Sequence, residues 1–182
     1  PYLMLRNAAD YKGIITKPEN YTGFPEGWEN IIGTRKTNVN SSGYDQYPSG
    51  RWYLENAMSN SSAALLHKNG TWAIMMSNTN PASIRMEFDL EFGASKFSFY
   101  YGAATTQAID AAPITLYPEY SQDGGVTWNP VDPAEPSLVV SSQTEKYFKE
   151  YVLKIDGNVR FRIRKDSPSG RLMVGDIFVQ PN

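Results

Sequence analysis

The chain has 182 residues, a length typical of one domain, which at this size buries about 70% of the surface that its unfolded chain exposes. Its 17 basic and 19 acidic residues give a formal net charge of −2. That balance argues against nucleic acid or an anionic membrane as partner, since both require a basic excess. There is no cysteine and one histidine, which excludes a Cys/His zinc site, a catalytic cysteine and disulfides.

The first 60 residues lack a regular pattern. The stretches 21–27 and 38–50 are rich in Gly, Pro, Ser and Asn, which are turn and loop residues. We expect long loops here that cover one edge or end of the fold.

From residue 61 onward, alternation of apolar and polar residues predicts half-buried β-strands. The clearest case is 83–90, where every second residue is apolar. The segment 144–152 has weak helical spacing but leads directly into a strand, so we predict a loop followed by a strand. The other predicted strands are 63–68, 71–77, 96–101, 114–120, 151–155, 159–164 and 172–178.

Turn signals separate these runs. Asn69-Gly70 predicts a tight hairpin between 63–68 and 71–77, because a type I′ turn needs positive φ at both positions. Asp123-Gly124-Gly125 and Asp156-Gly157-Asn158 predict two more hairpins. Many short strands without a convincing helix indicate one all-β domain over 1–182, an antiparallel β-sandwich. Jelly roll is the favoured topology, with an immunoglobulin-like sandwich as the alternative.

An ordered set of motifs runs from Phe24 to Ile177. Its segments are Phe24–Trp28, Arg51–Ala57, Lys68–Gly70, Met86–Leu90, Gly93–Ala94, Phe97–Gly102, Tyr120–Trp128, Val159–Ile163 and Arg171–Ile177. In this order they resemble jelly-roll modules of secreted proteins and surface lipoproteins of Bacteroides-type bacteria. Those modules are similar to carbohydrate-binding and MAM-like sandwiches, and many are domains of unknown function. The resemblance implies a sandwich fold and an exported location, whereas fold alone does not fix function.

For Asp176 the resemblance also offers a structural Ca²⁺, as the less favoured of two interpretations. In similar sandwiches an acidic residue on the last strand helps to hold the ion with oxygen ligands from the N-terminal region. Asp176 is that residue here, and Asp10 is the partner that the sequence offers. The alternative is that Gly175 bulges the strand and turns Asp176 outward, where it forms a hydrogen bond or salt bridge.

The segment 121–128 matches the Asp-box pattern Ser-x-Asp-x-Gly-x-Thr-Trp. In a sialidase this motif recurs on several propeller blades, but it occurs once in this chain. We therefore predict a structural role, in which Ser121 and Asp123 bind the turn backbone and Trp128 packs over the hairpin.

Three arginines, Arg160, Arg162 and Arg164, share one face of a predicted strand. We favour cross-strand ion pairs with the neighbouring 85–89 segment, because opposite charges stabilise sheets. The alternative is a site for an anionic glycan, which guanidinium groups grip through paired hydrogen bonds.

Aromatic residues make up 13% of the chain, and sugar sites use exposed Trp and Tyr rings beside polar donors. The first candidate cluster lies in the expected loop region. Trp52 is expected there as an exposed ring for binding, with the alternative that it packs under the loop and plugs the end of the sandwich, and Tyr53 should point the other way. Tyr101 points to the same side of its predicted strand as Phe97 and Phe99, so it should be buried. The candidate ligand-binding residues are Tyr44, Tyr47, Arg51, Trp52, Tyr100 and Tyr117.

We therefore expect a non-catalytic, carbohydrate-binding module. A structural or adhesion module with a cell-surface protein as partner is the alternative. A glycan-active enzyme is the least favoured hypothesis, because no two carboxylates among Glu87, Asp89, Glu91 and Glu119 can be placed at the separation that hydrolysis requires.

The chain contains no signal peptide and no membrane-spanning run, and it begins at Pro1. We interpret it as a mature chain whose targeting segment was removed. The expected location is extracellular or at the cell surface, with a lipid anchor on the removed segment as one route.

Overall fold

The computed structural model describes residues 17–62, 69–104, 113–166 and 170–182. These residues form strands and no helix, and none of them builds a helix that could cross a membrane. The strands are β1 (Gly43–Tyr47), β2 (Gly50–Glu55), β3 (Ala57–Asn60), β4 (Ala73–Met76), β5 (Ala82–Met86), β6 (Ala94–Ala103), β7 (Ile114–Ser121), β8 (Asn129–Pro130), β9 (Leu138–Val140), β10 (Tyr147–Ile155), β11 (Arg160–Lys165) and β12 (Leu172–Gln180).

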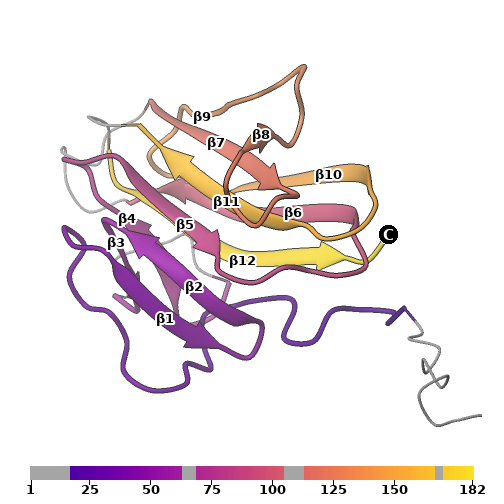
Figure 1. Ribbon diagram of the computed structural model, residues 1–182. Coiled ribbons are helices and arrows are strands. Elements are labelled where there is room, and N and C mark those ends of the chain that lie inside the picture. The colour runs from indigo at the N-terminus through magenta and orange to yellow at the C-terminus, as the bar shows by residue number, and fades with distance from the viewer. Residues whose placement is uncertain (1–16, 63–68, 105–112, 167–169) are drawn as a thin grey trace, which may run out of the picture.

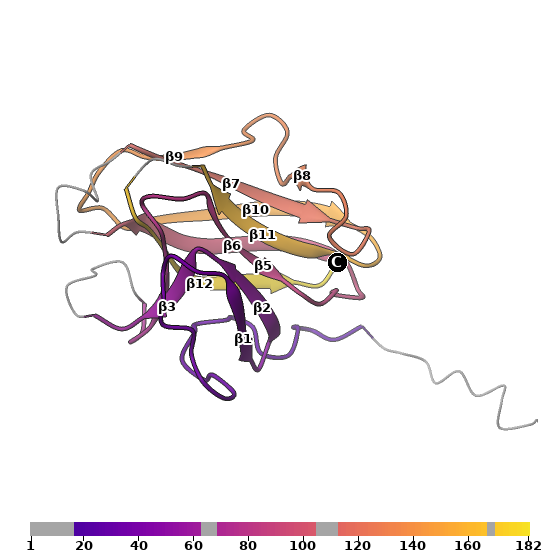
Figure 2. The ribbon, with the colours of Figure 1, turned by 60° about the vertical axis from the view of Figure 1, so that its left-hand side comes forward.

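The strands form two antiparallel sheets stacked as a jelly-roll sandwich (Figure 1 and Figure 2). The seven-stranded sheet has the order β1-β2-β5-β11-β7-β8, with β9 also paired to β7. The five-stranded sheet has the order β10-β6-β12-β4-β3. Strands β1 and β10 are therefore edge strands, one in each sheet. The prediction of an all-β antiparallel sandwich is confirmed.

The core lies between the two sheets, because alternate side chains of each strand point to the same side of its sheet. In β11, Phe161 and Ile163 point inward while the arginines point outward. In β6, Phe97 and Phe99 do the same, and Phe97 stacks on Phe161 across the interface at a centroid distance of 4.3 Å. Tyr101 is buried with them, as predicted.

The strands predicted from residue 83 onward are all present, although the one predicted over 83–90 ends at Met86, and the 144–152 segment leads into β10 as expected. The prediction that residues 1–60 are irregular is wrong for residues 43–60, which form β1, β2 and β3. Gly and Pro in this stretch serve short hairpin turns rather than long loops. Pro48 and Ser49 alone connect β1 to β2, since Tyr47 pairs with Gly50.

Two of the three turn predictions need correction. Strands β3 and β4 pair directly through Asn60 and Ala73, so Asn69-Gly70 is not a two-residue turn before β4. The predicted strand 63–68 lies outside the described residues. Gly70 does not have positive φ; its Cα is instead close to Glu29, whose Oε1 would lie 2.3 Å from an added Cβ. Asp156–Asn158 joins β10 to β11, which belong to different sheets. The hairpin at 123–125 is confirmed between β7 and β8.

Candidate functional site

The outer surface of the seven-stranded sheet carries a polar and aromatic row that crosses five strands. Opposite one another, from β1 to β7, lie Tyr44, Tyr53, Arg85, Arg162 and Glu119. They align because each occupies the outward position of its strand in register with the next. We call the outward side chains of β1, β2, β5, β11 and β7 the arginine face.

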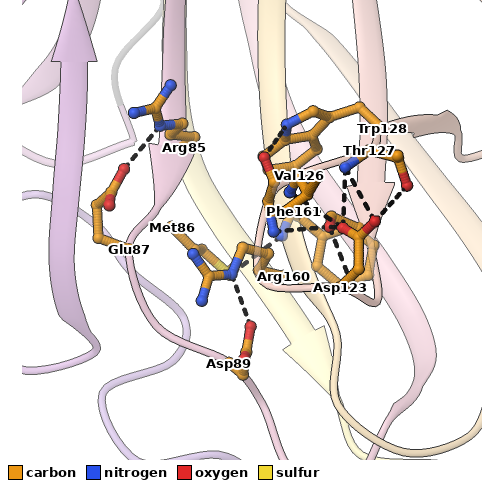
Figure 3. Close-up of polar contacts among 12 residues, drawn as sticks. Arg85, Met86, Glu87, Asp89, Asp123, Val126, Thr127, Trp128, Arg160 and Phe161 are labelled. Carbon is orange, nitrogen blue, oxygen red and sulfur yellow. Dashed lines mark hydrogen bonds and ion pairs between the residues drawn. The ribbon is translucent and has the colours of Figure 1, made fainter.

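Ion pairs neutralise most of this face. Figure 3 shows Arg85 bound to Glu87 and Arg160 bound to Asp89. The N–O distance is 2.6 Å in both ion pairs. The predicted pairing of the 160–164 arginines with the 85–89 segment is thus confirmed for Arg160.

The other two arginines of β11 have a different partner. Arg162 and Arg164 both bind Glu119 on β7, at 2.6 and 3.1 Å. Glu119 is itself largely buried beneath them. One carboxylate therefore holds two guanidinium groups, which would otherwise repel each other.

Each aromatic ring on this surface has a guanidinium beside it. Ring-centroid distances are 4.7 Å for Arg51 to Tyr44, 4.2 Å for Arg85 to Tyr53, 4.1 Å for Arg164 to Tyr117 and 4.3 Å for Arg162 to Trp128. These are cation–π distances. A guanidinium over a ring keeps N–H groups at its rim, so this surface presents apolar ring surface and hydrogen-bond donors together.

Tyr44 is the most exposed ring on the arginine face. Its exposed fraction is 52%, and its ring lies 5.1 Å from that of Tyr53 in a tilted arrangement. Arg51, which is also exposed, completes the group on β2. The structure thus brings together two of the predicted residues, Tyr44 and Arg51, with Tyr53, which the sequence analysis set aside.

Trp52 and Tyr47 are not exposed, which corrects the expectation of an exposed loop cluster. Trp52 is only 1% exposed, because it alternates with Arg51 and Tyr53 along β2 and so faces the core. Its ring packs edge-on against Trp28, and its Nε1 donates to Ser49 Oγ at 3.0 Å. The prediction that Tyr53 points the other way is confirmed by its half-exposed position.

Tyr47 is also a core residue. Its hydroxyl donates to Asp45 Oδ2 at 3.0 Å and accepts a bond from Arg35. Burial, together with the Asp45 charge, raises the pKa of Tyr47 well above its usual range. Its hydroxyl is therefore a satisfied structural group.

A buried carboxylate fixes the turn of the β1–β2 hairpin. Glu26 accepts bonds from Ser49 Oγ at 2.5 Å and from the backbone N–H of Trp28 at 2.8 Å. Trp28 in turn donates through Nε1 to the Gly175 carbonyl. Burial raises the pKa of Glu26, and the nearby charge of Asp176 raises it further. Sequence reasoning missed this support, because residues far apart in the chain form it.

Asp176 lies at a β-bulge, which confirms that Gly175 interrupts the strand. Val174 pairs with Tyr101 and Ile177 with Phe99, so three steps on β12 oppose two on β6. Asp176 is therefore only partly buried and lies beside Gly27, whose added Cβ would be 3.4 Å from its Oδ1.

The described residues alone do not fit a Ca²⁺ at Asp176. None of them forms a group of three or more His, Cys, Asp or Glu side chains that could hold a metal ion. Both carboxylate oxygens of Glu26, an acidic neighbour of Asp176, already accept hydrogen bonds. Asp10 lies outside the described residues, so the Ca²⁺ site stays a prediction.

The 121–128 turn has the internal bonds expected of a structural motif (Figure 3). Asp123 accepts from the Ser121 hydroxyl, from the backbone of Val126 and from the backbone and hydroxyl of Thr127. These bonds hold the pKa of Asp123 far below its usual range, with the Ser121 hydroxyl as the largest cause. Trp128 donates back to the Gly125 carbonyl, which closes the turn.

Tyr100 and Tyr117, two further candidates, lie on opposite sides of the molecule. Tyr117 belongs to the arginine face, beside Arg164. Tyr100 points outward from the five-stranded sheet, where its ring lies 4.8 Å from Phe148 and Lys146 Nζ lies 5.0 Å from its centroid. The six predicted residues therefore belong to three environments: the arginine face, the core and the opposite sheet.

A hollow of about 320 Å³ opens at one end of the sandwich, beside Asp89. Its aromatic lining comes from Tyr21, Phe88 and Phe92, and Glu91 and Ser49 add polar groups. The Asp89–Arg160 ion pair links this hollow to the arginine face.

No protein-family model matches this chain, and a comparison with curated proteins finds no match. Several solved structures share its fold. The carbohydrate-binding module TmCBM61, solved with β-1,4-galactotriose, is 13% identical with a TM-score of 0.55, covering 91% of this chain and 100% of that one.

The K1 cleaved adhesin domain of Lys-gingipain from Porphyromonas gingivalis is 11% identical with a TM-score of 0.54, covering 82% and 99%. A family 35 carbohydrate-binding module from Clostridium thermocellum is 17% identical with a TM-score of 0.50, covering 78% and 99%. At these identities the likeness concerns the fold, which this chain shares with both carbohydrate-binding modules and adhesin domains.

Proposed function

We propose that this protein is a non-catalytic carbohydrate-binding module that binds glycans on the arginine face, at Tyr44 and Tyr53. The observation that carries the proposal is an exposed pair of tyrosine rings bordered by hydrogen-bond donors. Sugar rings have apolar C–H surfaces that pack on aromatic rings and hydroxyls that need polar partners. The structural likeness to carbohydrate-binding modules supports the same proposal.

The polar groups that would contact sugar hydroxyls surround the two rings. Arg51 and Arg85 supply N–H donors, and Glu87 and Gln46 supply acceptors on the neighbouring outward positions. The Arg85–Glu87 pair holds both side chains in place before a ligand arrives, which lowers the entropic cost of binding.

The proposal includes no chemical step. Glu87, Asp89 and Glu119 each form an ion pair with an arginine. Glycoside hydrolysis needs one carboxyl group kept protonated by a raised pKa and a second carboxylate beside the scissile bond. In the structure each of these three carboxylates is instead held by a guanidinium group. We place the module at the cell surface or outside the cell, where it would encounter the glycans that it binds.

A second candidate function is adhesion to a protein, and one surface favours it. Phe148 and Val152 point outward from β10 with exposed fractions of 52% and 80%; Phe148 lies opposite Tyr100, and Val152 lies opposite Lys96. Exposed apolar groups of this kind mark protein-binding surfaces. Adhesin domains of the same fold are consistent with this alternative.

The test compares two matched variants, Tyr44→Ala and Phe148→Ala. Both side chains are 52% exposed on edge strands, so both truncations should leave stability nearly unchanged. Binding is measured on a glycan array and by affinity electrophoresis in β-1,4-galactan. We expect Tyr44→Ala to weaken glycan binding by about tenfold or more, and Phe148→Ala to leave it unchanged.

Two results would overturn the proposal. The first is wild-type protein that binds no glycan on the array. The second is a loss confined to Phe148→Ala, which would move the binding surface to the opposite sheet.

A further inference from the structure

We infer that the Tyr44–Tyr53 site selects sugars that carry a carboxylate, with Arg51 as the residue that recognises this group. The inference rests on the proposed function and adds a ligand class to it. The ligand class is a glycan that contains uronic acid.

Arg51 differs from the other arginines of this surface. Four of the five, Arg85, Arg160, Arg162 and Arg164, each hold a carboxylate of the protein. Within the described part of the chain, no carboxylate lies at ion-pair distance from Arg51, whose contact is the Tyr44 ring at 4.7 Å. It is also exposed. Arg51 therefore has an accessible guanidinium group whose charge no neighbouring carboxylate neutralises.

The position of Arg51 suits a uronic acid. It lies on β2 opposite Gln46 and diagonal to Tyr44, so its guanidinium and the tyrosine rings face the same space. A sugar ring packed on Tyr44 or Tyr53 would present the groups at its rim to Arg51. A carboxylate there matches the paired N–H donors of a guanidinium, whereas a hydroxyl uses one donor at a time.

The acidic side chains near Arg51 do not oppose such a ligand. Glu87 follows the strand paired with β2, but its carboxylate is bound to Arg85. Asp45 on β1 points into the core, where Tyr47 and the Lys36 backbone donate to it. Glu55, at the far end of β2, accepts a bond from Ser83.

The charge of the whole chain offers no general attraction for polyanions, because its formal net value is −2. Long-range steering would not bring an acidic polymer to this protein. Preferential retention of such a polymer would therefore report a local site.

The test uses pairs of polymers that differ only in the carboxyl group. Polygalacturonate and alginate are each compared with their carboxyl-reduced forms in affinity electrophoresis, alongside neutral β-1,4-galactan. We expect wild type to bind at least one acidic polymer about tenfold more tightly than its reduced form, which is the effect of one charged hydrogen bond. The preference should shrink as salt concentration rises.

Three variants localise the effect. Arg51→Gln should lose the preference, so that acidic and reduced polymers are bound equally, and Arg51→Lys should restore it only in part because a single ammonium lacks the paired donors. Lys146→Gln removes the same charge from the opposite sheet and should change nothing. Equal binding of acidic and reduced polymers, or a preference that survives in Arg51→Gln, would overturn the inference and leave the proposed function standing. Failure of every polymer, neutral ones included, would overturn both.

Discussion

Two pairs of aromatic rings occupy equivalent places on opposite surfaces of the sandwich. Tyr44 and Phe148 each lie on an edge strand, each is 52% exposed, and each contacts a tyrosine on the next strand at 5.1 and 4.8 Å. Each pair also has a cation nearby, Arg51 in one case and Lys146 in the other. By exposure and ring geometry alone, the two would be equal candidates for a binding site.

Their surroundings separate them. Next to the Tyr44 pair lie guanidinium groups and carboxylates already held in ion pairs, so polar ligand groups find fixed partners. Next to the Phe148 pair, Glu150 forms an exposed ion pair with Lys96 that is long, at 3.5 Å, and Val152 lies beyond it, opposite Lys96. The first surface suits a sugar, and the second suits an apolar partner. An aromatic ring thus becomes a sugar platform through the polar groups around it.

The largest effect should come from the support under the Tyr44 pair. Trp52→Ala removes a fully buried ring that packs on Trp28 and donates to Ser49, so it should lower the free energy of unfolding by about 3–5 kcal/mol. Tyr44→Ala, on the same hairpin but outside the core, is the control and should cost under about 1 kcal/mol. Denaturant unfolding measures both. Equal, small losses would mean that Trp52 is not the anchor of the hairpin.

A smaller effect should distinguish the ion pairs of the two surfaces. Glu119→Gln leaves Arg162 and Arg164 adjacent without their shared, largely buried carboxylate, and should cost about 1–3 kcal/mol in the free energy of unfolding. Glu150→Gln breaks only the exposed pair with Lys96 and should cost under about 0.5 kcal/mol. Urea titrations at low salt compare the two. A loss in Glu150→Gln as large as that in Glu119→Gln would contradict the difference drawn between the surfaces.

Sequence pattern predicted the regular part of this fold well, because burial on one side of a sheet forces apolar residues to alternate. The 96–101 and 159–164 segments show this, and both are central strands with a core face and a solvent face. The same rule applied to 51–55 would have placed Trp52 inside and Arg51 outside. The Gly and Pro residues of the β1–β2 turn instead favoured the prediction of a loop, since they are equally typical of long loops.

The candidate site was predicted only in part for a related reason. Tyr44 and Arg51 were identified from their residue types, but the partners that define their surroundings come from other strands. Glu119, for example, reaches Arg162 across 43 positions of sequence, through a strand pairing that no local pattern specifies. The bulge at Gly175 could be predicted because its signal is local. Strand alternation would place the acidic Asp176 in the core, and the glycine before it allows the strand to bulge.

The smallest effect concerns two buried tyrosine hydroxyls, one beneath each surface. Tyr47, next to the Tyr44 pair, has its hydroxyl bonded to Asp45 and Arg35. Tyr151, on β10 with Phe148, has a buried hydroxyl for which the described residues provide no hydrogen-bond partner, and burial raises its pKa. A buried hydroxyl without a partner loses its hydration and gains nothing in return.

Removing the two hydroxyls should therefore have opposite effects. Tyr151→Phe should raise the free energy of unfolding by about 1 kcal/mol, because it deletes the unsatisfied group and keeps the ring stacked on Phe97. Tyr47→Phe should lower it by about 1–2 kcal/mol, because Asp45 loses a donor in the core. Both are measured by denaturant unfolding against wild type. A loss in Tyr151→Phe would mean that its hydroxyl has a stabilising partner, and the support under the Phe148 surface would then resemble that under Tyr44 more closely than the geometry indicates.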